Sequence, residues 1–306
     1  MIAGAWFVRT KIIDGKTPSV TTTQPSGTDA PANGSRELIC IPELAEVCRA
    51  SGSAYREEAA GTTFAKLVSP TQADFVWMSL SPWPEMVDSA RVRAGLPPIA
   101  ADRRKALAST TVVLAAPTDR VAVLKTACSD MAWKCLGEKM NRPWKDIAGP
   151  AGWQDVTFRH RDPLSSASGL SVLGAALAGR TGRTDLSSSD LAANDVRSWA
   201  TQLEDTNKQP SSDPLTSVLV GTRFDVVGAL ATEVPTTGRA ATLEPMPVAR
   251  VSATLMATSG NLSNDLATSL SGALGKNGWQ PGVAASGLPD AVGMEAVQRL
   301  WQEVIR

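Results

Sequence analysis

The strongest constraint on the fold is an alternation of short apolar segments with segments of helical periodicity. Residues 73–80, ADFVWMSL, and 107–117, LASTTVVLAAP, are almost continuously apolar. Such runs are typical of strands that are buried on both faces of a parallel sheet. Each run is followed at once by a helical pattern, at 81–88 and at 118–128. We therefore predict an α/β fold of mostly parallel sheets flanked by helices.

The length and charge of the chain limit its architecture and its partners. At 306 residues, the chain is long enough for one large domain or two lobes with a substantial core. Lys plus Arg and Asp plus Glu balance at 30 each, and no run of five or more basic residues is present. We therefore expect no nucleic-acid partner.

The four cysteines fall into two close pairs, Cys40 with Cys48 and Cys128 with Cys135. Four cysteines allow three connectivities, and we predict the two local disulfides because each closes a short loop. Four unpaired buried thiols are the alternative. Disulfides indicate an oxidising compartment, whereas these spacings and a single histidine argue against a metal site.

Residues 1–35 are expected to lie outside the folded body. The apolar run from Ile2 to Val8 is too short to span a bilayer, and 14–35 is almost free of large apolar residues. A segment of that composition cannot order itself by burial. We interpret 1–35 as an apolar stub and a flexible tether, which is the layout of a membrane-tethered extracellular domain.

Catalytic signatures are missing from the sequence. No GxSxG, HExxH, Walker or GxGxxG motif is present. The only imidazole, His160, stands between Arg159 and Arg161, whose charges are expected to lower its pKa. We predict a structural histidine, no catalytic residue, no cofactor and no enzymatic activity.

The segment 162–179, DPLSSASGLSVLGAALAG, is predicted to form a helix that Gly179 closes, because leucines recur at i, i+3 and i+7. Three serines precede it: Ser165, Ser166 and Ser168. One hydroxyl is enough to cap the first turn. The others are either solvated or donors to a polar or anionic group at the positive helix end.

In open α/β sheets, ligands bind beyond the carboxyl ends of the strands, where helices begin. Three such junctions can be named in this sequence, at 40–42, at 79–83 and at 165–168. Ser81 and Thr118 are predicted to cap the helices that follow the two buried strands.

The order of these segments resembles that of extracytoplasmic solute-binding proteins. The resemblance rests on 73–88, 107–120, 162–179, 245–256 and 273–281, and it covers roughly residues 36–306. It is strongest to actinobacterial members with the type II periplasmic-binding fold, the group that includes molybdate and sulfate binders.

The resemblance implies two α/β lobes that are joined by two crossing strands and enclose a ligand by hinge closure. Lobe 1 is expected over 36–109 plus 246–306, and lobe 2 over 110–245. The crossings are expected near 109–111 and 245–247.

The resemblance also implies that hydroxyl-bearing turns converge on one cleft. The implied ligand-binding residues are Ile41, Pro42, Ser79, Ser81, Trp83, Thr110, Ser165, Ser166 and Ser168, with Glu233 as a weaker addition. The first turn departs from the family, because Cys40-Ile41-Pro42 stands where its anion binders have a Ser or Thr.

The implied function is a monomeric, surface-anchored protein that captures a small polar or anionic solute for an ABC-type membrane permease. The alternative is a domain of the same fold that does not transport and acts as an envelope sensor or a protein-interaction module.

Overall fold

The computed structural model describes residues 36–70, 74–207, 213–219, 225–236 and 238–305. The predicted stub and tether over 1–35 lie outside the described residues. Among those described, no helix has both the length and the apolar character that crossing a membrane requires.

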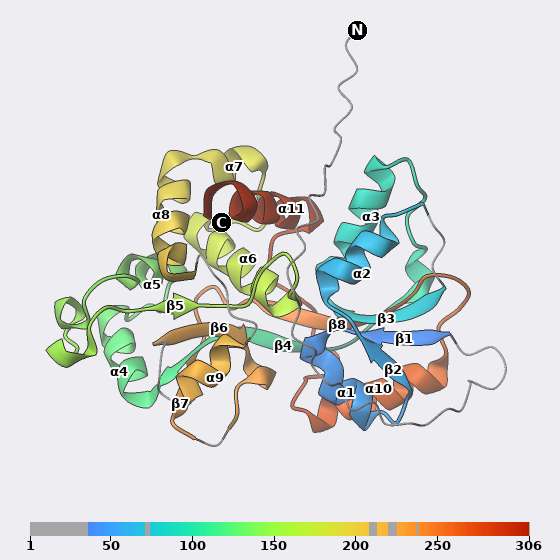
Figure 1. Ribbon diagram of the computed structural model, residues 1–306, viewed down its shortest axis with the longest axis horizontal. Coiled ribbons are helices and arrows are strands. Elements are labelled where there is room, and N and C mark those ends of the chain that lie inside the picture. Colours follow the sequence, from blue (N-terminus) through green and yellow to red (C-terminus); the bar gives the residue numbers. More distant parts are fainter. Residues whose placement is uncertain (1–35, 71–73, 208–212, 220–224, 237, 306) are drawn as a thin grey trace, which may run out of the picture. The chain divides into compact units, whose positions relative to one another are not determined.

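The strands run in the order β2–β1–β3–β8–β4–β6–β5, and β7 pairs with β4 outside this path (Figure 1). Their bounds are β1 Glu37–Cys40, β2 Tyr55–Glu57, β3 Phe75–Leu80, β4 Arg104–Pro117, β5 Phe158–Arg159, β6 Val226–Leu230, β7 Ala240–Leu243 and β8 Arg250–Ala257.

Strand β4 takes part in two groups of strands. Its first half, from Arg104 to Thr111, pairs with β8, and its second half, from Val112 to Pro117, pairs with β6 and β7. The pairs β1–β2, β1–β3 and β5–β6 are parallel, as expected. Every antiparallel pair involves β4 or β8, so the sheet is mixed where these two strands meet the others. The expectation of parallel pairing is therefore wrong for 107–117, because all three partners of β4 run antiparallel to it.

Helices cover both faces of the sheet. Their bounds are α1 Ala45–Ala50, α2 Ala60–Leu67, α3 Trp83–Arg93, α4 Thr118–Ala127, α5 Trp133–Lys139, α6 Ala167–Thr181, α7 Ser188–Ala192, α8 Asn194–Glu204, α9 Pro214–Leu219, α10 Asn264–Lys276 and α11 Ala291–Leu300. Beside β1–β3, α2 and α3 lie on one face, and α1 and α10 lie on the other (Figure 1).

The predicted lobe limits stay a prediction. The C-terminal helix α11 contacts α3 as well as α6 and α7, so it packs on elements from both predicted lobes.

Two predicted helix caps are wrong. Helix α3 begins at Trp83, and the Ser81 hydroxyl instead accepts a hydrogen bond from the Ser252 N–H at 2.9 Å. Thr118 lies inside α4, and its hydroxyl donates to the Arg239 carbonyl at 3.2 Å. Both hydroxyls therefore have partners that are distant in sequence.

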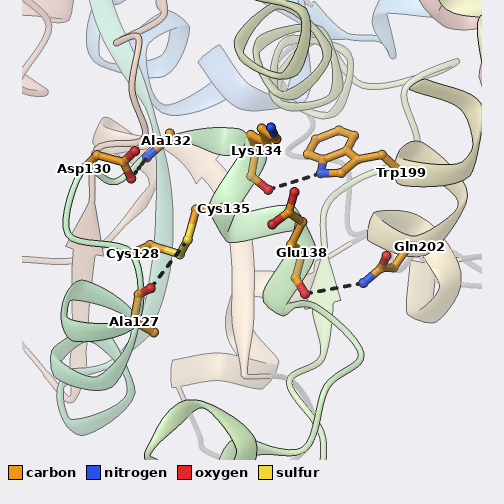
Figure 2. The surroundings of a disulfide bond; sticks show 9 residues. All are labelled: Ala127, Cys128, Asp130, Ala132, Lys134, Cys135, Glu138, Trp199 and Gln202. Atoms are coloured by element: carbon orange, nitrogen blue, oxygen red, sulfur yellow. Dashed lines mark hydrogen bonds between the residues drawn. A yellow bond between two sulfur atoms is a disulfide. The ribbon is translucent and has the colours of Figure 1, made fainter. Parts of the chain in front are cut away.

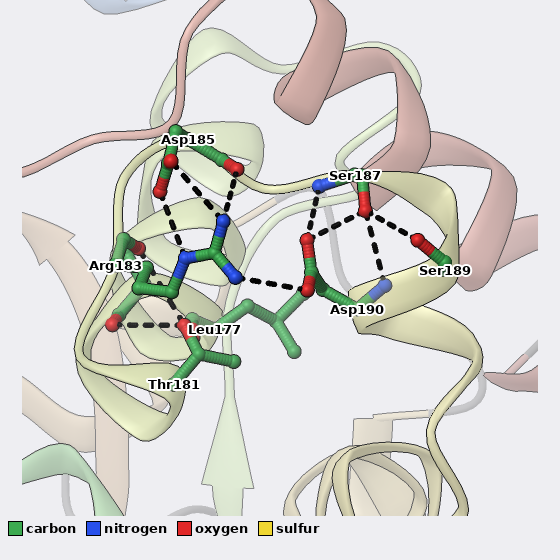
Figure 3. A network of polar contacts seen from close by, with 8 residues as sticks. Leu177, Thr181, Arg183, Asp185, Ser187, Ser189 and Asp190 are labelled. Atoms are coloured by element: carbon green, nitrogen blue, oxygen red, sulfur yellow. Dashed lines mark hydrogen bonds and ion pairs between the residues drawn. The ribbon is translucent and has the colours of Figure 1, made fainter.

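Helix α6 runs past Gly179 and ends at Thr181, because Gly182 is the residue with a left-handed backbone, at φ 72°. Beyond this end, Arg183 pairs with Asp185 and Asp190 (Figure 3). Asp190 and Ser187 form the capping box that begins α7. Local hydrogen bonds thus fix the turn between the two helices.

Both predicted disulfides are confirmed, Cys40–Cys48 and Cys128–Cys135. The second joins the loop after α4 to α5 (Figure 2). Helix α5 in turn packs closely on α8, since a Cβ at Gly137 would lie 2.3 Å from the Trp199 ring.

We expect a thiol assay on the unreduced, unfolded protein to detect no free thiol. Replacing Cys40 and Cys48 together with alanine should lower the free energy of unfolding by about 2–3 kcal/mol, because a short closed loop is lost from the unfolded chain. The Cys128→Ala/Cys135→Ala variant is the matched comparison, since its loop has nearly the same length. Titratable thiols in the unreduced protein would contradict both disulfides.

Candidate ligand-binding site

The start of α6 is enclosed by protein. The helix is buried from Ala167 to Ala178, and it lies against β3, β4 and β6. The first N–H groups of a helix have no partner within the helix, and buried N–H groups need acceptors. The start of α6 must therefore be satisfied by side chains that other segments supply.

Ser166 is the serine that caps α6. Its hydroxyl accepts a hydrogen bond from the Gly169 N–H at 3.1 Å and lies 3.1 Å from the Ser168 hydroxyl. Ser165 is exposed, and its hydroxyl donates to the Asp162 carbonyl at 3.4 Å. Two of the three predicted serines thus lie together at the helix start, and the third faces solvent.

The acceptor for these groups is Glu43, which lies in the short 3-10 turn Pro42–Leu44 directly after β1. Its Oε1 accepts hydrogen bonds from the Ser166 hydroxyl at 2.6 Å and from the Ser168 N–H at 3.0 Å. The Ser168 hydroxyl donates to the same oxygen at 3.4 Å. A carboxylate at the positive end of a helix is favourable, because the helix dipole and the free N–H groups both attract negative charge.

A second ion pair lies beside this contact. Arg161 pairs with Glu233, whose Oε2 also accepts the Leu230 N–H at 2.9 Å. Burial raises the pKa of Glu233, and the Glu43 carboxylate adds to this, while Arg161 opposes it. Arg161 is itself partly desolvated, yet Glu233 and Glu43 raise the pKa of its guanidinium. The two carboxylates and the arginine therefore share one electrostatic environment.

A cavity of about 10 Å³ lies between Arg161, Ser168 and Glu233, and α9 and β6 supply its apolar wall. That volume holds at most one water molecule. A much larger hollow of about 470 Å³ lies beside the start of β3, where Asp74 and Thr258 are among its lining residues. Of the polar residues described above, Arg161, Ser168 and Glu233 line the small cavity, whereas none of the predicted site residues lines the large one.

The side chains of the other predicted residues form no hydrogen bonds with this cluster among the described residues. Ile41 is fully buried, and its N–H donates to the Met78 carbonyl at 3.2 Å, while Pro42 is exposed. Ser79 is also fully buried, and its hydroxyl has no partner among the described residues. Trp83 is a core side chain in edge contact with Phe64 at 5.5 Å.

Thr110 does not share a face with Ser79. In antiparallel strands, directly opposite residues point to the same face, and neighbours along a strand alternate. Ser79 is opposite Thr254, and Ser109 is opposite Ser252, so these four share one face. Thr110 is opposite Val251 and therefore points to the other face. Strand alternation thus places Thr110 and Ser79 on opposite faces, and their convergence in one cleft stays a prediction.

His160 is a structural histidine, as predicted, but the predicted direction of its pKa is wrong. The ring is fully buried, with Nε2 3.0 Å from Glu204 and Nδ1 2.7 Å from the Arg161 carbonyl. Desolvation lowers the pKa of the imidazole, but the charge and hydrogen bond of Glu204 outweigh it, so the pKa is raised. His160 thereby holds the backbone of Arg161 in place.

Two residues of this cluster were missed or underused by the sequence reasoning. The sequence predicted for Arg161 only a charge that acts on His160, and it gave no role to Glu43. The available signal for Glu43 was its position, because it directly follows the predicted junction at 40–42 after the first strand. No group of three or more His, Cys, Asp or Glu in the described part of the chain is placed to hold a metal ion.

Solved structures with the same arrangement are periplasmic binding proteins. A periplasmic thiamin binding protein matches with a TM-score of 0.56 at 12% identity, over 89% of this chain and 96% of that one. AfuA from Actinobacillus pleuropneumoniae, with fructose-6-phosphate bound, gives 0.55 at 15% identity, over 89% and 98%. The sulfate-binding protein SubI from Mycobacterium tuberculosis gives 0.51 at 14% identity, over 89% and 91%.

The chain has the two-lobed α/β fold of periplasmic binding proteins. The predicted fold class is confirmed by this likeness and by the mixed sheet with helices on both faces. Neither a protein-family model nor a curated protein matches the sequence. At identities of 12–15%, the likeness to these binding proteins extends to the fold alone.

We expect the three serines to differ in their contribution to stability. Ser166→Ala removes the cap of α6 and a donor to Glu43, and it should lower the free energy of unfolding by about 1–2 kcal/mol. Ser165→Ala is the matched control on the exposed side, and it should change that free energy by less than about 0.5 kcal/mol. Denaturant unfolding measures both variants. Equal losses would contradict the assignment of Ser166 as the cap.

The raised pKa of His160 predicts a loss of stability with rising pH. The folded protein holds this proton more tightly than the unfolded chain, so the stabilisation is complete below the unfolded pKa of about 6.5 and is lost as pH rises through the folded pKa. We expect the free energy of unfolding to fall as pH rises above about 6.5. The His160→Gln variant should show a flatter dependence. A wild-type curve no steeper than that of His160→Gln would contradict the charged pair with Glu204.

Proposed function

We propose that the protein is an extracytoplasmic solute-binding protein that takes up a small polar or anionic solute at the start of α6. The observation that carries this proposal is the meeting of three separate segments there. Glu43 lies after β1 and bonds to Ser166 and Ser168 at the start of α6. Glu233 lies after β6 and pairs with Arg161. Few, well-placed polar groups in an otherwise apolar wall are typical of small-molecule sites.

The proposed mechanism is closure of two lobes around the solute. Lobe 1 would comprise 36–109 and 246–306, and lobe 2 would comprise 110–245. Strand β4 supports this division, because its pairing partners change between Thr111 and Val112. The second connection runs from the end of β7 to the start of β8, at 244–249. Hinges of this kind absorb a backbone rotation in a few residues at the ends of elements.

The solute class and the setting are also proposals. SubI is a sulfate-binding protein, and AfuA was solved with fructose-6-phosphate, so anionic groups occur among the ligands of similar folds. The two disulfides support an oxidising, extracytoplasmic location. An ABC-type permease as partner, tethering through 1–35, a monomeric state, actinobacterial origin and molybdate or sulfate specificity rest on the family resemblance.

A second function is favoured by one specific observation. The donors at the start of α6 are already used by Glu43, and the neighbouring cavity of about 10 Å³ leaves no room for a solute in the described arrangement. A domain of this fold that no longer transports, and acts as an envelope sensor or a protein-interaction module, would have such a filled site.

A solute screen by thermal shift separates the two functions. A solute that binds only the folded protein stabilises it by about 2.7 kcal/mol at a concentration of 100 times its Kd. We expect one of sulfate, molybdate, fructose 6-phosphate, thiamine or an amino acid to raise the Tm of the full chain. Ser168→Ala should weaken that binding at least tenfold, and Ser165→Ala should leave it unchanged.

If no solute raises the Tm, solute capture is contradicted and the non-transporting function is supported. If a solute raises the Tm equally in wild type and in Ser168→Ala, the protein binds solutes at another site. That result would contradict the start of α6 as the binding site.

A further inference from the structure

We propose that the Glu43 carboxylate is a built-in occupant of the anion site at the start of α6, so that an external anionic group binds only by displacing it. This inference rests on the proposed function, since it concerns the regulation of the same site. Glu43 lies before β4, whereas Ser166 and Ser168 lie between β4 and β8, 123 and 125 residues further along the chain. The contact therefore joins the two predicted lobes.

The geometry is that of a bound carboxylate. One oxygen, Oε1, receives the Ser166 hydroxyl at 2.6 Å, the Ser168 N–H at 3.0 Å and the Ser168 hydroxyl at 3.4 Å. These are the donors that an anionic group of a solute would need at a helix start. While Glu43 accepts these hydrogen bonds, the same donors cannot bind the anionic group of a solute.

Charge and space both favour displacement over simple addition. The Glu43, Glu233 and Asp213 carboxylates all act on one guanidinium, that of Arg161, and the Glu43 charge acts on Glu233 as well. An added anion would meet like charge, whereas an anion that replaces Glu43 leaves the balance unchanged. The cavity beside Arg161 and Ser168, at about 10 Å³, is also too small for a sulfate or a carboxylate.

The hydrogen bonding of the Glu43 carboxylate is incomplete, and this favours its displacement by a solute. The second oxygen of Glu43, Oε2, is buried and has no hydrogen-bond partner among the described residues. A buried acceptor without a donor is costly compared with one in water. If the carboxylate swings out to solvent, Oε2 regains hydrogen bonds, while a solute satisfies the serines that Glu43 leaves.

A close backbone contact holds the same segments together. The Gly61 N–H at the start of α2 donates to the Ser165 carbonyl at 3.4 Å. A Cβ at Gly61 would lie 2.1 Å from the Leu164 carbonyl oxygen. The segment that leads into α6 is therefore pressed against α2 as well as bound by Glu43. The added methyl group of Gly61→Ala would therefore push α2 and the segment before α6 apart without changing any charge of the site.

The test is anion binding by Glu43 variants of the full chain, measured by calorimetry and thermal shift with sodium acetate and sodium sulfate. Sodium chloride at equal ionic strength is the salt control. Glu43→Ala should bind acetate or sulfate at least tenfold more tightly than wild type, and Ser168→Ala in that background should abolish the gain. Glu46→Ala, an exposed glutamate three residues away, is the matched control and should behave as wild type.

A folded Glu43→Ala that binds acetate and sulfate no better than wild type and Glu46→Ala would overturn the proposal. Circular dichroism establishes that the variant is folded. If Glu43→Ala does not fold, Glu43→Gln and Gly61→Ala take its place, because the first keeps the side-chain shape and the second keeps all charges. Failure of both to gain anion binding would equally overturn it.

The outcomes separate this inference from the proposed function. If wild type and Glu43→Ala bind the same solute with equal affinity, the proposal that Glu43 occupies the site is wrong, while solute capture is supported. If no solute binds wild type but Glu43→Ala gains acetate binding, the occupant is supported and solute capture by the wild-type protein is contradicted.

Discussion

The pairing of β4 on two sides is the constraint on which the other elements depend. Its 14 residues bond to β8 in the first half and to β6 and β7 in the second. Because the strand is buried from Leu107 to Ala116, it cannot shift without exposing apolar surface on both sides. The position of α6, which packs against β4 and β6, follows from this strand, and so does the position of the α6 start.

The apolar character of α6 then determines the chemistry of the site. A helix that is apolar all round has to be buried, and its free N–H groups are buried with it. Side chains must satisfy these groups, and the strongest acceptor among them is the Glu43 carboxylate. Burial raises the pKa of the neighbouring Glu233 even beside Arg161, and the charge of the Glu43 carboxylate adds to this effect. Packing and electrostatics at this site are therefore parts of one arrangement.

Local patterns in the sequence predicted many elements but not their long-range partners. Apolar runs located β3 and β4, and the leucine spacing located α6, because burial and periodicity are local properties of a segment. Ser81 and Thr118 stand at positions typical of caps, yet they bond to Ser252 and Arg239. Thr110 carries a suitable hydroxyl, but its face depends on strand register, which a residue type does not encode.

The amino-acid sequence alone was sufficient for the α/β class, for the two disulfides and for a capped helix start with spare hydroxyls. Each of these follows from residues that are close together along the chain. The sequence was not sufficient for the hydrogen bonds of Glu43 or for the charged pairs of Arg161 and His160, whose partners lie 44 to 125 residues away. Such pairs, and the pKa directions that follow from them, depend on which segments the folded chain buries side by side, because charge interactions act through space and strengthen when water is excluded.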